Sequence, residues 1–202
     1  MIIPCRNEET TIEKLLKSLL TQTYPLEQTE VIIADGLSQD GTREKIESFR
    51  ASHPELTVLL IENPEQKIPF ALNRAIRAST GEYIIRLDAH SIPDRQYLQK
   101  CVDGLQAGKG ENVGGVWIIQ PSDSTWISRS IAAAAANPLG VGNAYYRYSN
   151  RQGYVDTVPF GAFKRGIFDT VGFFDESLLS NEDYELNERI RQHGGKVWMD
   201  PS

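Results

Sequence analysis

Residues 31–42 carry the run Val31-Ile32-Ile33-Ala34-Asp35-Gly36-Leu37-Ser38-Gln39-Asp40-Gly41-Thr42. The four apolar residues at its start predict a short strand buried on both faces, which is typical of a parallel sheet. The strand ends at Asp35-Gly36, and a polar turn leads into a helix that carries Ile46 and Phe49, with Thr42 placed to cap it. A strand joined to a helix in this way is the building unit of an α/β fold.

The same unit recurs on both sides of residues 31–42. A first strand is expected at residues 1–5, followed by a helix whose apolar residues recur at helical spacing: Ile12, Leu15, Leu16, Leu19 and Leu20. Further strands are expected at 58–62 and 83–87, and further helices at 70–78 and from Pro93-Asp94 onward. This alternation predicts a mostly parallel central sheet flanked by crossover helices.

The second half of the chain is less regular. Its sequence predicts strands at 114–120 and 158–164, helices at 125–136, 165–171 and 182–193, and a long loop at 139–157. Loops of that length in a compact domain often carry function. We expect one domain over residues 1–202, and its abrupt ends predict that it is part of a longer chain.

The composition excludes several classes of protein. The formal net charge of -6 disfavours non-specific nucleic-acid binding, which needs a basic face, so no nucleic-acid partner is expected. Two separate cysteines, Cys5 and Cys101, form no disulfide framework, and the first residues form no secretory signal, so a cytoplasmic setting is expected. The longest apolar stretch, residues 131–136, is far short of the ~20 residues that a membrane helix needs.

Polar side chains follow three of the predicted strands. Asn7 and Glu8 follow the first, Asp35 follows the second, and Asp88 and His90 follow the fourth. One such residue is more simply explained as a turn residue. Because ligands of an open parallel sheet bind beyond the carboxyl ends of its strands, three successive examples predict a shared crevice.

The triplet Asp88-Ala89-His90 offers two metal ligands. In an extended segment, residues two apart point to the same side, so Asp88 and His90 can reach one ion. Mn or Mg held there could in turn bind phosphate oxygens. The simpler alternative is that Asp88 closes a turn and His90 is a surface residue.

The pair Glu182-Asp183 opens the predicted helix at 182–193. Carboxylates at a helix start are favoured by the helix dipole, so both residues could be merely capping groups. Asp183 could instead be a general base that accepts the proton of an attacking hydroxyl. Since Ser180 and Asn181 already offer a conventional cap, the catalytic interpretation gains weight.

Five segments in order resemble glycosyltransferase family 2, whose members have the GT-A fold. They are residues 2–9, residues 32–42, residues 71–75 with 80–83, residues 86–90, and residues 181–186 with Arg189 and Gly194-Gly195. The resemblance spans nearly the whole chain. It implies a nucleotide-binding half at about 1–105 and an acceptor-side half at about 106–202.

The resemblance also implies roles for single residues. Pro4, Asn7 and Glu8 would lie along the nucleotide-sugar, with Asp35 hydrogen-bonded to its base, and Asp88 beside the diphosphate. Asp88 and His90 would bind a divalent metal, Mn or Mg, that offsets charge on the leaving nucleoside diphosphate. Asp183 would be the base of an inverting displacement.

One departure from the family pattern concerns the metal ligands. His90 stands where the D-x-D motif has its second acid, so the site has one negative charge fewer. This variant is similar to the subgroup that builds exopolysaccharides such as succinoglycan, which implies a UDP-sugar donor, UDP-glucose in the first instance. The acceptor would be a saccharide or a lipid-linked saccharide at the cytoplasmic face, with membrane contact made by segments outside this chain.

Two alternative functions stay open at this stage. A sugar-phosphate nucleotidyltransferase would need a glycine-rich, basic loop after the first strand, where this chain has Arg6-Asn7-Glu8-Glu9. A non-catalytic module that binds a nucleotide or sugar would have no need of both Asp88 and Asp183. No phosphate-loop motif or zinc-ligand spacing is present in the sequence.

Overall fold

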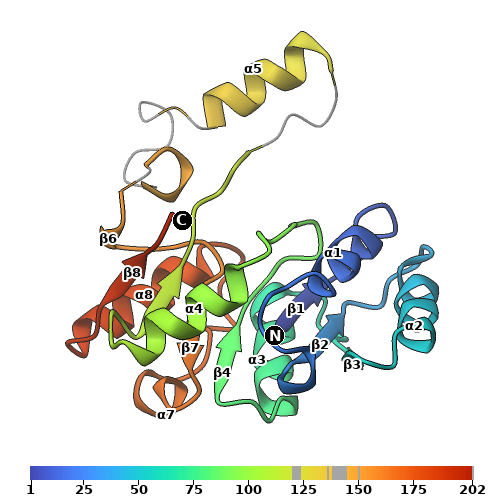
Figure 1. Ribbon diagram of the computed structural model, residues 1–202, viewed down its shortest axis with the longest axis horizontal. Coiled ribbons are helices and arrows are strands. Elements are labelled where there is room, and N and C mark those ends of the chain that lie inside the picture. Colours follow the sequence, from blue (N-terminus) through green and yellow to red (C-terminus); the bar gives the residue numbers. More distant parts are fainter. Residues whose placement is uncertain (120–123, 136, 138–144, 150, 202) are drawn as a thin grey trace.

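The central sheet is built from two adjoining parts (Figure 1). The computed structural model describes residues 1–119, 124–135, 137, 145–149 and 151–201. Its strands are β1 (Ile2–Cys5), β2 (Glu30–Asp35), β3 (Thr57–Glu62), β4 (Tyr83–Ile85), β5 (Asn112–Gly114), β6 (Gly153–Tyr154), β7 (Ala162–Lys164) and β8 (Val197–Met199). Its α-helices are α1 (Ile12–Leu19), α2 (Thr42–Ser52), α3 (Ile68–Ala78), α4 (Tyr97–Gln106), α5 (Trp126–Ala135), α7 (Ile167–Val171) and α8 (Glu182–Gln192).

The two parts of the sheet differ in strand direction. Strands β1, β2 and β3 are parallel, in the order β1-β2-β3. The second part has the order β4-β7-β5-β8-β6 and is mixed, since β7 runs antiparallel to both β4 and β5. A parallel bridge between Ile2 and Arg86 joins the parts, and the Leu87 amide donates to the Ile2 carbonyl at 3.1 Å.

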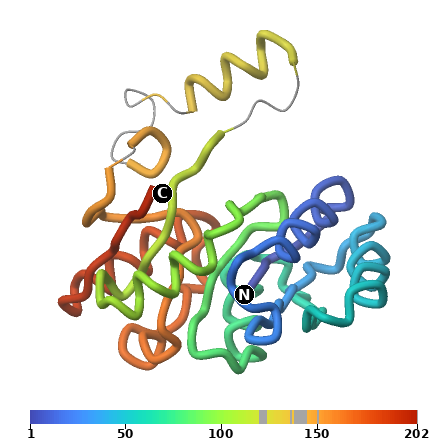
Figure 2. Tube along the Cα trace, viewed as in Figure 1, coloured from blue at the N-terminus to red at the C-terminus, as the bar shows by residue number. Residues whose placement is uncertain are grey.

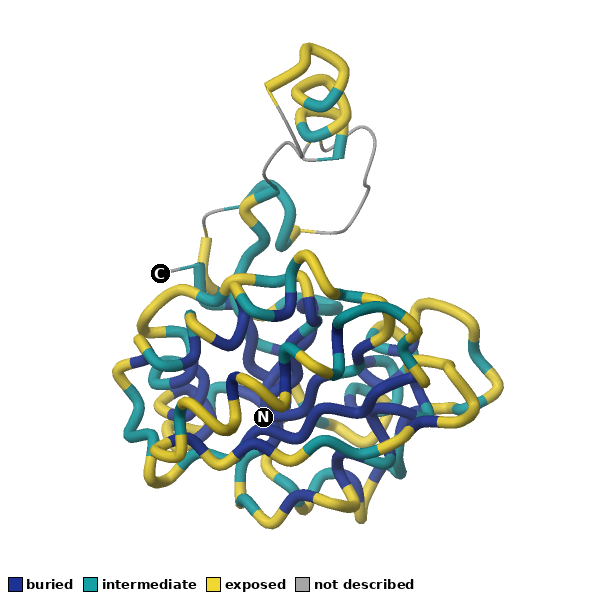
Figure 3. Tube along the Cα trace, turned by 90° about the vertical axis from the view of Figure 1, so that its right-hand side faces the viewer, coloured by how far each residue is buried: buried dark blue, intermediate teal, exposed yellow. Residues whose placement is uncertain are grey.

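Helices cover both faces of the sheet because alternate strand residues point to opposite sides. Ile3 and Ile33 belong to the core beneath α1, α2 and α4. Ile2 and Ile32 belong to the other core, which contains apolar residues of α3, α7 and α8. In Figure 3 the buried strands run through the middle of the domain and the exposed segments form its rim. The predicted α/β fold is confirmed, with its parallel pairing concentrated in the first half.

Helix α5 lies apart from the rest of the domain (Figures 1 and 2). None of its described residues is buried, and the Trp126 side chain is largely exposed. Within the described part of the chain, no helix is long and apolar enough to cross a membrane.

Several predicted boundaries shift. The strand expected at 114–120 ends at Gly114, with Gln120 outside the described residues, and the strand expected at 158–164 begins only at Ala162. The second shift has a local cause, because Phe160 and Gly161 have positive φ angles of 63° and 77°, which a strand cannot accommodate. Thr42 is the first residue of α2 rather than its cap. The loop expected at 139–157 falls partly outside the described residues.

Candidate active site

A pocket opens beyond the carboxyl ends of β1 and β4. It is lined by Pro4, Cys5, Arg6, Glu8, Gly36, Asn63, Gln66, Lys67, Ile68, Ala71, Asp88, Ala89 and His90. Four of the predicted site residues, Pro4, Glu8, Asp88 and His90, therefore share one pocket. The pocket lies where the polar strand ends predict a crevice, and it contains Glu8 after β1 and Asp88 and His90 after β4, but neither Asn7 nor Asp35 lines it.

Glu8 and His90 face each other at the rim of this pocket. His90 Nδ1 lies 3.2 Å from Glu8 Oε1, and the Thr11 hydroxyl donates to the other oxygen of the Glu8 carboxylate. The His90 side chain is 62% exposed. The imidazole is thus accessible to a ligand, while Glu8 is oriented by two neighbours.

The buried Arg86 side chain binds the carboxylate of Asp88. Asp88 Oδ1 accepts hydrogen bonds from Arg86 Nη2 at 3.2 Å and from Arg86 Nε at 3.4 Å. Arg86 follows β4 directly, and its side chain is only 3% exposed. A buried cation is costly unless it is paired, and here Asp88 supplies part of the pairing.

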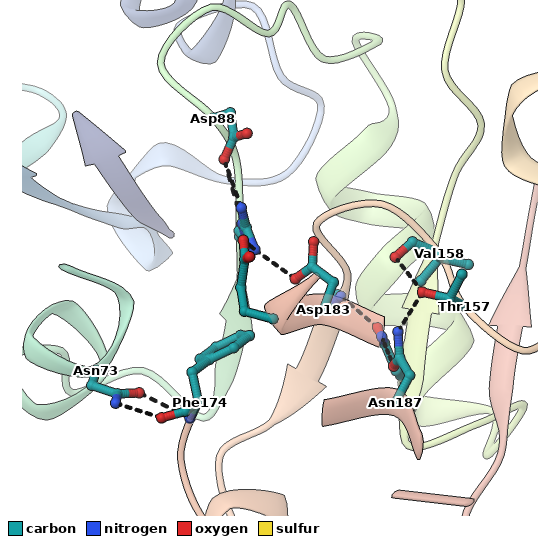
Figure 4. Close-up of polar contacts among 11 residues, drawn as sticks. Asn73, Asp88, Thr157, Val158, Phe174, Asp183 and Asn187 are labelled. Atoms are coloured by element: carbon teal, nitrogen blue, oxygen red, sulfur yellow. Dashed lines mark hydrogen bonds and ion pairs between the residues drawn. The ribbon is translucent and has the colours of Figure 1, made fainter. Parts of the chain in front are cut away.

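Asp183 lies on the other side of the same guanidinium. Arg86 Nη1 donates to Asp183 Oδ1 at 2.6 Å and lies 2.9 Å from Glu182 Oε1. The Asp183 side chain stays 22% exposed, so an incoming hydroxyl can reach it. In Figure 4, Asp88 lies on the segment after β4 and Asp183 at the start of α8. The predicted metal ligand and the predicted base are therefore linked through Arg86.

The environment shifts the protonation of this cluster. Burial raises the pKa of Asp183 to about 6, and the charges of Glu182 and Asp88 add to this rise while Arg86 opposes it. Burial alone would lower the pKa of Arg86, but Asp183, Asp88 and Glu182 more than offset this and raise it. At neutral pH Asp183 is mostly ionised, with a proton affinity close to the value that suits a general base.

Asp35 and Asn7 lie beside the pocket but belong to a loop-joining network. Asp35 is fully buried, and its carboxylate accepts hydrogen bonds from the Ser38 amide and from Arg43 Nη1, both at 3.1 Å. Asn7 Oδ1 accepts from the Gln39 amide at 2.9 Å. The bond between Asn7 and Gln39 ties the loop after β1 to the loop after β2, whereas the two bonds to Asp35 stay within the segment from β2 to α2. Contact of Asp35 or Asn7 with a nucleotide stays a prediction.

Helix α8, which carries Asp183, is anchored by buried amides. Asn112 Nδ2 donates to Asn187 Oδ1 at 2.7 Å, and Asn187 Nδ2 donates to the Thr157 hydroxyl at 2.9 Å. The segment before α8 is fixed by Asn73, which exchanges two hydrogen bonds with the Phe174 backbone (Figure 4). Both helix α8 and the segment that precedes it are thus anchored to the core.

Sequence reasoning missed Arg86 and these asparagines as site residues. A signal for Arg86 exists, because it is the one charged residue in the apolar run Tyr83-Ile84-Ile85-Arg86-Leu87. A charge in a buried strand requires partners, so it points to carboxylates nearby. Asn73, Asn112 and Asn187 carry no comparable signal, since their partners are distant in sequence.

The backbone around the site adopts unusual conformations. Five non-glycine residues of the described chain have positive φ: Asn7, Leu37, Gln66, Phe160 and Asn181. Gln66 lines the pocket, Asn7 and Leu37 each adjoin a lining residue, the Phe160 ring lies over the Arg86 guanidinium at 5.6 Å, and Asn181 precedes Glu182. Such conformations persist only where the surroundings enforce them, and they cluster at functional sites.

The residues that line the pocket are suited to a divalent metal ion whose other ligands come from a bound substrate. Among the described residues, no group of three or more His, Cys, Asp or Glu is arranged to hold an ion. Asp88 and His90 nevertheless line one pocket and offer a carboxylate and an imidazole, which are ligands for Mn. Ions that bind through one or two protein ligands plus substrate phosphates need no larger protein cage.

Comparison with solved structures defines the class of protein. The mannosyltransferase PcManGT from Pyrobaculum calidifontis, in complex with GDP-Man and Mn2+, matches with a TM-score of 0.76 at 25% identity, over 100% of this chain and 54% of that chain. S. aureus TarS 1-349 in complex with UDP matches with a TM-score of 0.75 at 16% identity, over 98% of this chain and 56% of that chain. The fold is that of the GT-A glycosyltransferases.

Sequence comparison then identifies the family. The family described as Glycosyl transferase family 2 matches residues 1–172, and the chain belongs to this family. Succinoglycan biosynthesis protein ExoA of Rhizobium meliloti is 32% identical over 98% of this chain and 59% of its own length. Glycosyltransferase AglE of Haloferax volcanii is 36% identical over 96% of this chain and 61% of its own length.

These matches confirm the predicted resemblance to glycosyltransferase family 2. The chain spans about three fifths of the length of these curated relatives.

Proposed function

We propose that this chain is the catalytic domain of an inverting glycosyltransferase that moves a sugar from a nucleotide-sugar to a saccharide or lipid-linked acceptor. The observation that carries the proposal is that the Arg86 guanidinium contacts both Asp88 and Asp183. On one side Asp88 lines the same pocket as Glu8 and His90, and on the other Asp183 stays partly exposed. A donor in the pocket would place its reacting carbon near a carboxylate that can take up a proton.

In the proposed reaction Asp183 accepts the proton of the acceptor hydroxyl. The hydroxyl oxygen forms a bond to the anomeric carbon of the donor, and the bond from that carbon to the diphosphate oxygen breaks. Asp88 and His90 would hold the divalent metal, which supplies Lewis-acid stabilisation of the leaving diphosphate. The pKa of about 6 leaves Asp183 ionised at neutral pH and ready for this step.

The donor is proposed to be a UDP-sugar, with UDP-glucose the first to test. Support comes from the similarity to the succinoglycan biosynthesis protein and from the complex of TarS with UDP. PcManGT, whose complex contains GDP-Man, makes GDP-sugars the necessary comparison. Thermal melts with UDP-, GDP- and dTDP-sugars plus Mn should give the largest rise in Tm for a UDP-sugar, because a ligand that binds only the folded state stabilises it.

The setting proposed is cell-surface or exopolysaccharide synthesis at the cytoplasmic face of the membrane. The similarity to the succinoglycan protein supports the first part. A relative from Methanococcus voltae, named as acting on a dolichyl N-acetyl-alpha-D-glucosaminyl phosphate, is 29% identical over 100% of this chain and supports a lipid-linked acceptor.

Asp183→Asn tests the function directly. Transfer from the donor found in the melts should fall by about 10²–10⁴-fold, the range typical of a lost general base, while UDP binding with Mn is retained. Asp169→Asn, which changes an exposed carboxylate on α7, is the matched control and should keep full activity. Full activity in Asp183→Asn would reject Asp183 as the base.

A further inference from the structure

Arg86 is unusual among the charged side chains because it is buried and has three carboxylate partners. Its Nε and Nη2 face Asp88, and its Nη1 faces Glu182 and Asp183. Guanidinium is planar and rigid, so partners on two of its edges are fixed relative to each other. Arg86 thus links Asp88 on one edge of its guanidinium to Asp183 on another.

The backbone of Arg86 is fixed as firmly as its side chain. Its amide donates to the Gly161 carbonyl at 3.0 Å, and the next amide, of Leu87, donates to the Ile2 carbonyl at 3.1 Å. The guanidinium therefore projects from a segment bonded on both sides within the sheet. Groups on such elements are positioned more accurately than groups on loops.

We propose that Arg86 is a positioning residue, whose guanidinium aims the Asp183 carboxylate while its other edge sets Asp88 at a fixed place beside the donor. The inference rests on the proposed function of Asp183. In this proposal the Arg86 side chain fixes the position of Asp183, the proposed base, relative to Asp88 beside the donor. A purely structural role, in which Arg86 only neutralises buried acids, makes different predictions.

The charges that face Asp183 come from two segments, the one after β4 and the start of α8. Arg86, after β4, lowers the pKa of Asp183, whereas Glu182 on α8 and Asp88 raise it. Tyr97 on α4 also faces the cluster, but burial raises the pKa of its hydroxyl well above the ordinary value, so it stays neutral. Removing Arg86 and removing Glu182 should therefore shift the titration of Asp183 in opposite directions.

The test is the pH profile of kcat/KM in four proteins: the wild type, Arg86→Met, Arg86→Lys and Glu182→Gln. The wild type should lose activity in acid as Asp183 gains a proton, with a midpoint at about 6. Arg86→Met should move this midpoint to higher pH, and Glu182→Gln should move it to lower pH. Arg86→Lys keeps the charge, so its midpoint should stay near that of the wild type.

The split between kcat and KM tests positioning. Because lysine lacks the fork of donors, Arg86→Lys should misplace Asp183 and lower kcat by about 10²-fold, with a much smaller change in donor KM. Arg50→Met, an exposed arginine on α2, is the control and should change neither value.

Three results would overturn the inference: a full kcat in Arg86→Lys, an unmoved midpoint in Glu182→Gln, or shifts of Arg86→Met and Glu182→Gln in the same direction. If thermal melts show that Arg86→Met does not fold, Arg86→Lys and Glu182→Gln still test the inference. The proposed function fails separately, if the wild type transfers no sugar or Asp183→Asn stays active.

Discussion

Asp183 and His90 sit at opposite ends of the candidate site and are held in contrasting ways. Asp183 contacts the buried guanidinium of Arg86. It belongs to helix α8, which is anchored by the buried side chains of Asn112 and Asn187. His90 is 62% exposed and contacts Glu8 at the pocket rim. The end that carries the proposed base is therefore organised before any substrate arrives, whereas the proposed donor end keeps exposed polar groups that a bound nucleotide and its metal would reorder.

This contrast has a physical basis. A base must be aimed at one atom, and preorganised groups in a water-poor setting cost little reorganisation during reaction. A metal bound partly through substrate phosphates needs ligands that remain reachable. Substitutions at the two ends should therefore differ in their effects.

Asp88 belongs to both ends, so its substitution should have the largest effect. Asp88→Asn removes a proposed metal ligand and one partner of Arg86, and transfer should fall by at least about 10²-fold, the cost typical of one lost electrostatic contact in a transition state. Steady-state kinetics at several Mn concentrations would measure it. If added Mn restored full activity, Asp88 would act through metal affinity alone, and its link to Arg86 would carry no catalytic weight.

Asn187 tests whether the base end is held by the fold. Asn187→Leu leaves the buried amide of Asn112 without its partner and should lower the free energy of unfolding by about 1–3 kcal/mol. Urea unfolding monitors the change, with Gln106→Ala on the exposed face of α4 as the control. A variant as stable as the control would show that α8 is anchored mainly by apolar packing.

His90 should give the smallest effect of the three. His90→Ala removes an exposed, proposed metal ligand and should weaken Mn-dependent UDP binding by at least about tenfold, the lower range seen for disturbed metal sites. Calorimetry compares it with His53→Ala, a histidine beyond the end of α2. Unchanged Mn affinity would remove His90 from the metal site and leave Asp88 as the predicted ligand there.

Much of the fold followed from local patterns. The run at 31–42 gave the correct strand, turn and helix, because four apolar residues and a polar turn are local features. The strand predicted at 158–164 was too long, because the positive φ angles at Phe160 and Gly161 arise from packing. Gly161 has no room for a side chain, since a Cβ there would lie 2.3 Å from Asn112 Oδ1.

The sequence by itself determined the α/β class and the residue types at the strand ends, since both depend on neighbours within a few positions. Only the tertiary structure decided which of these residues meet. It brought Asp183 to Arg86 across 97 positions of sequence and buried Asp35 among its loop partners. Contacts of that range depend on how helices and strands pack, because a buried charge is tolerated only where distant partners neutralise it.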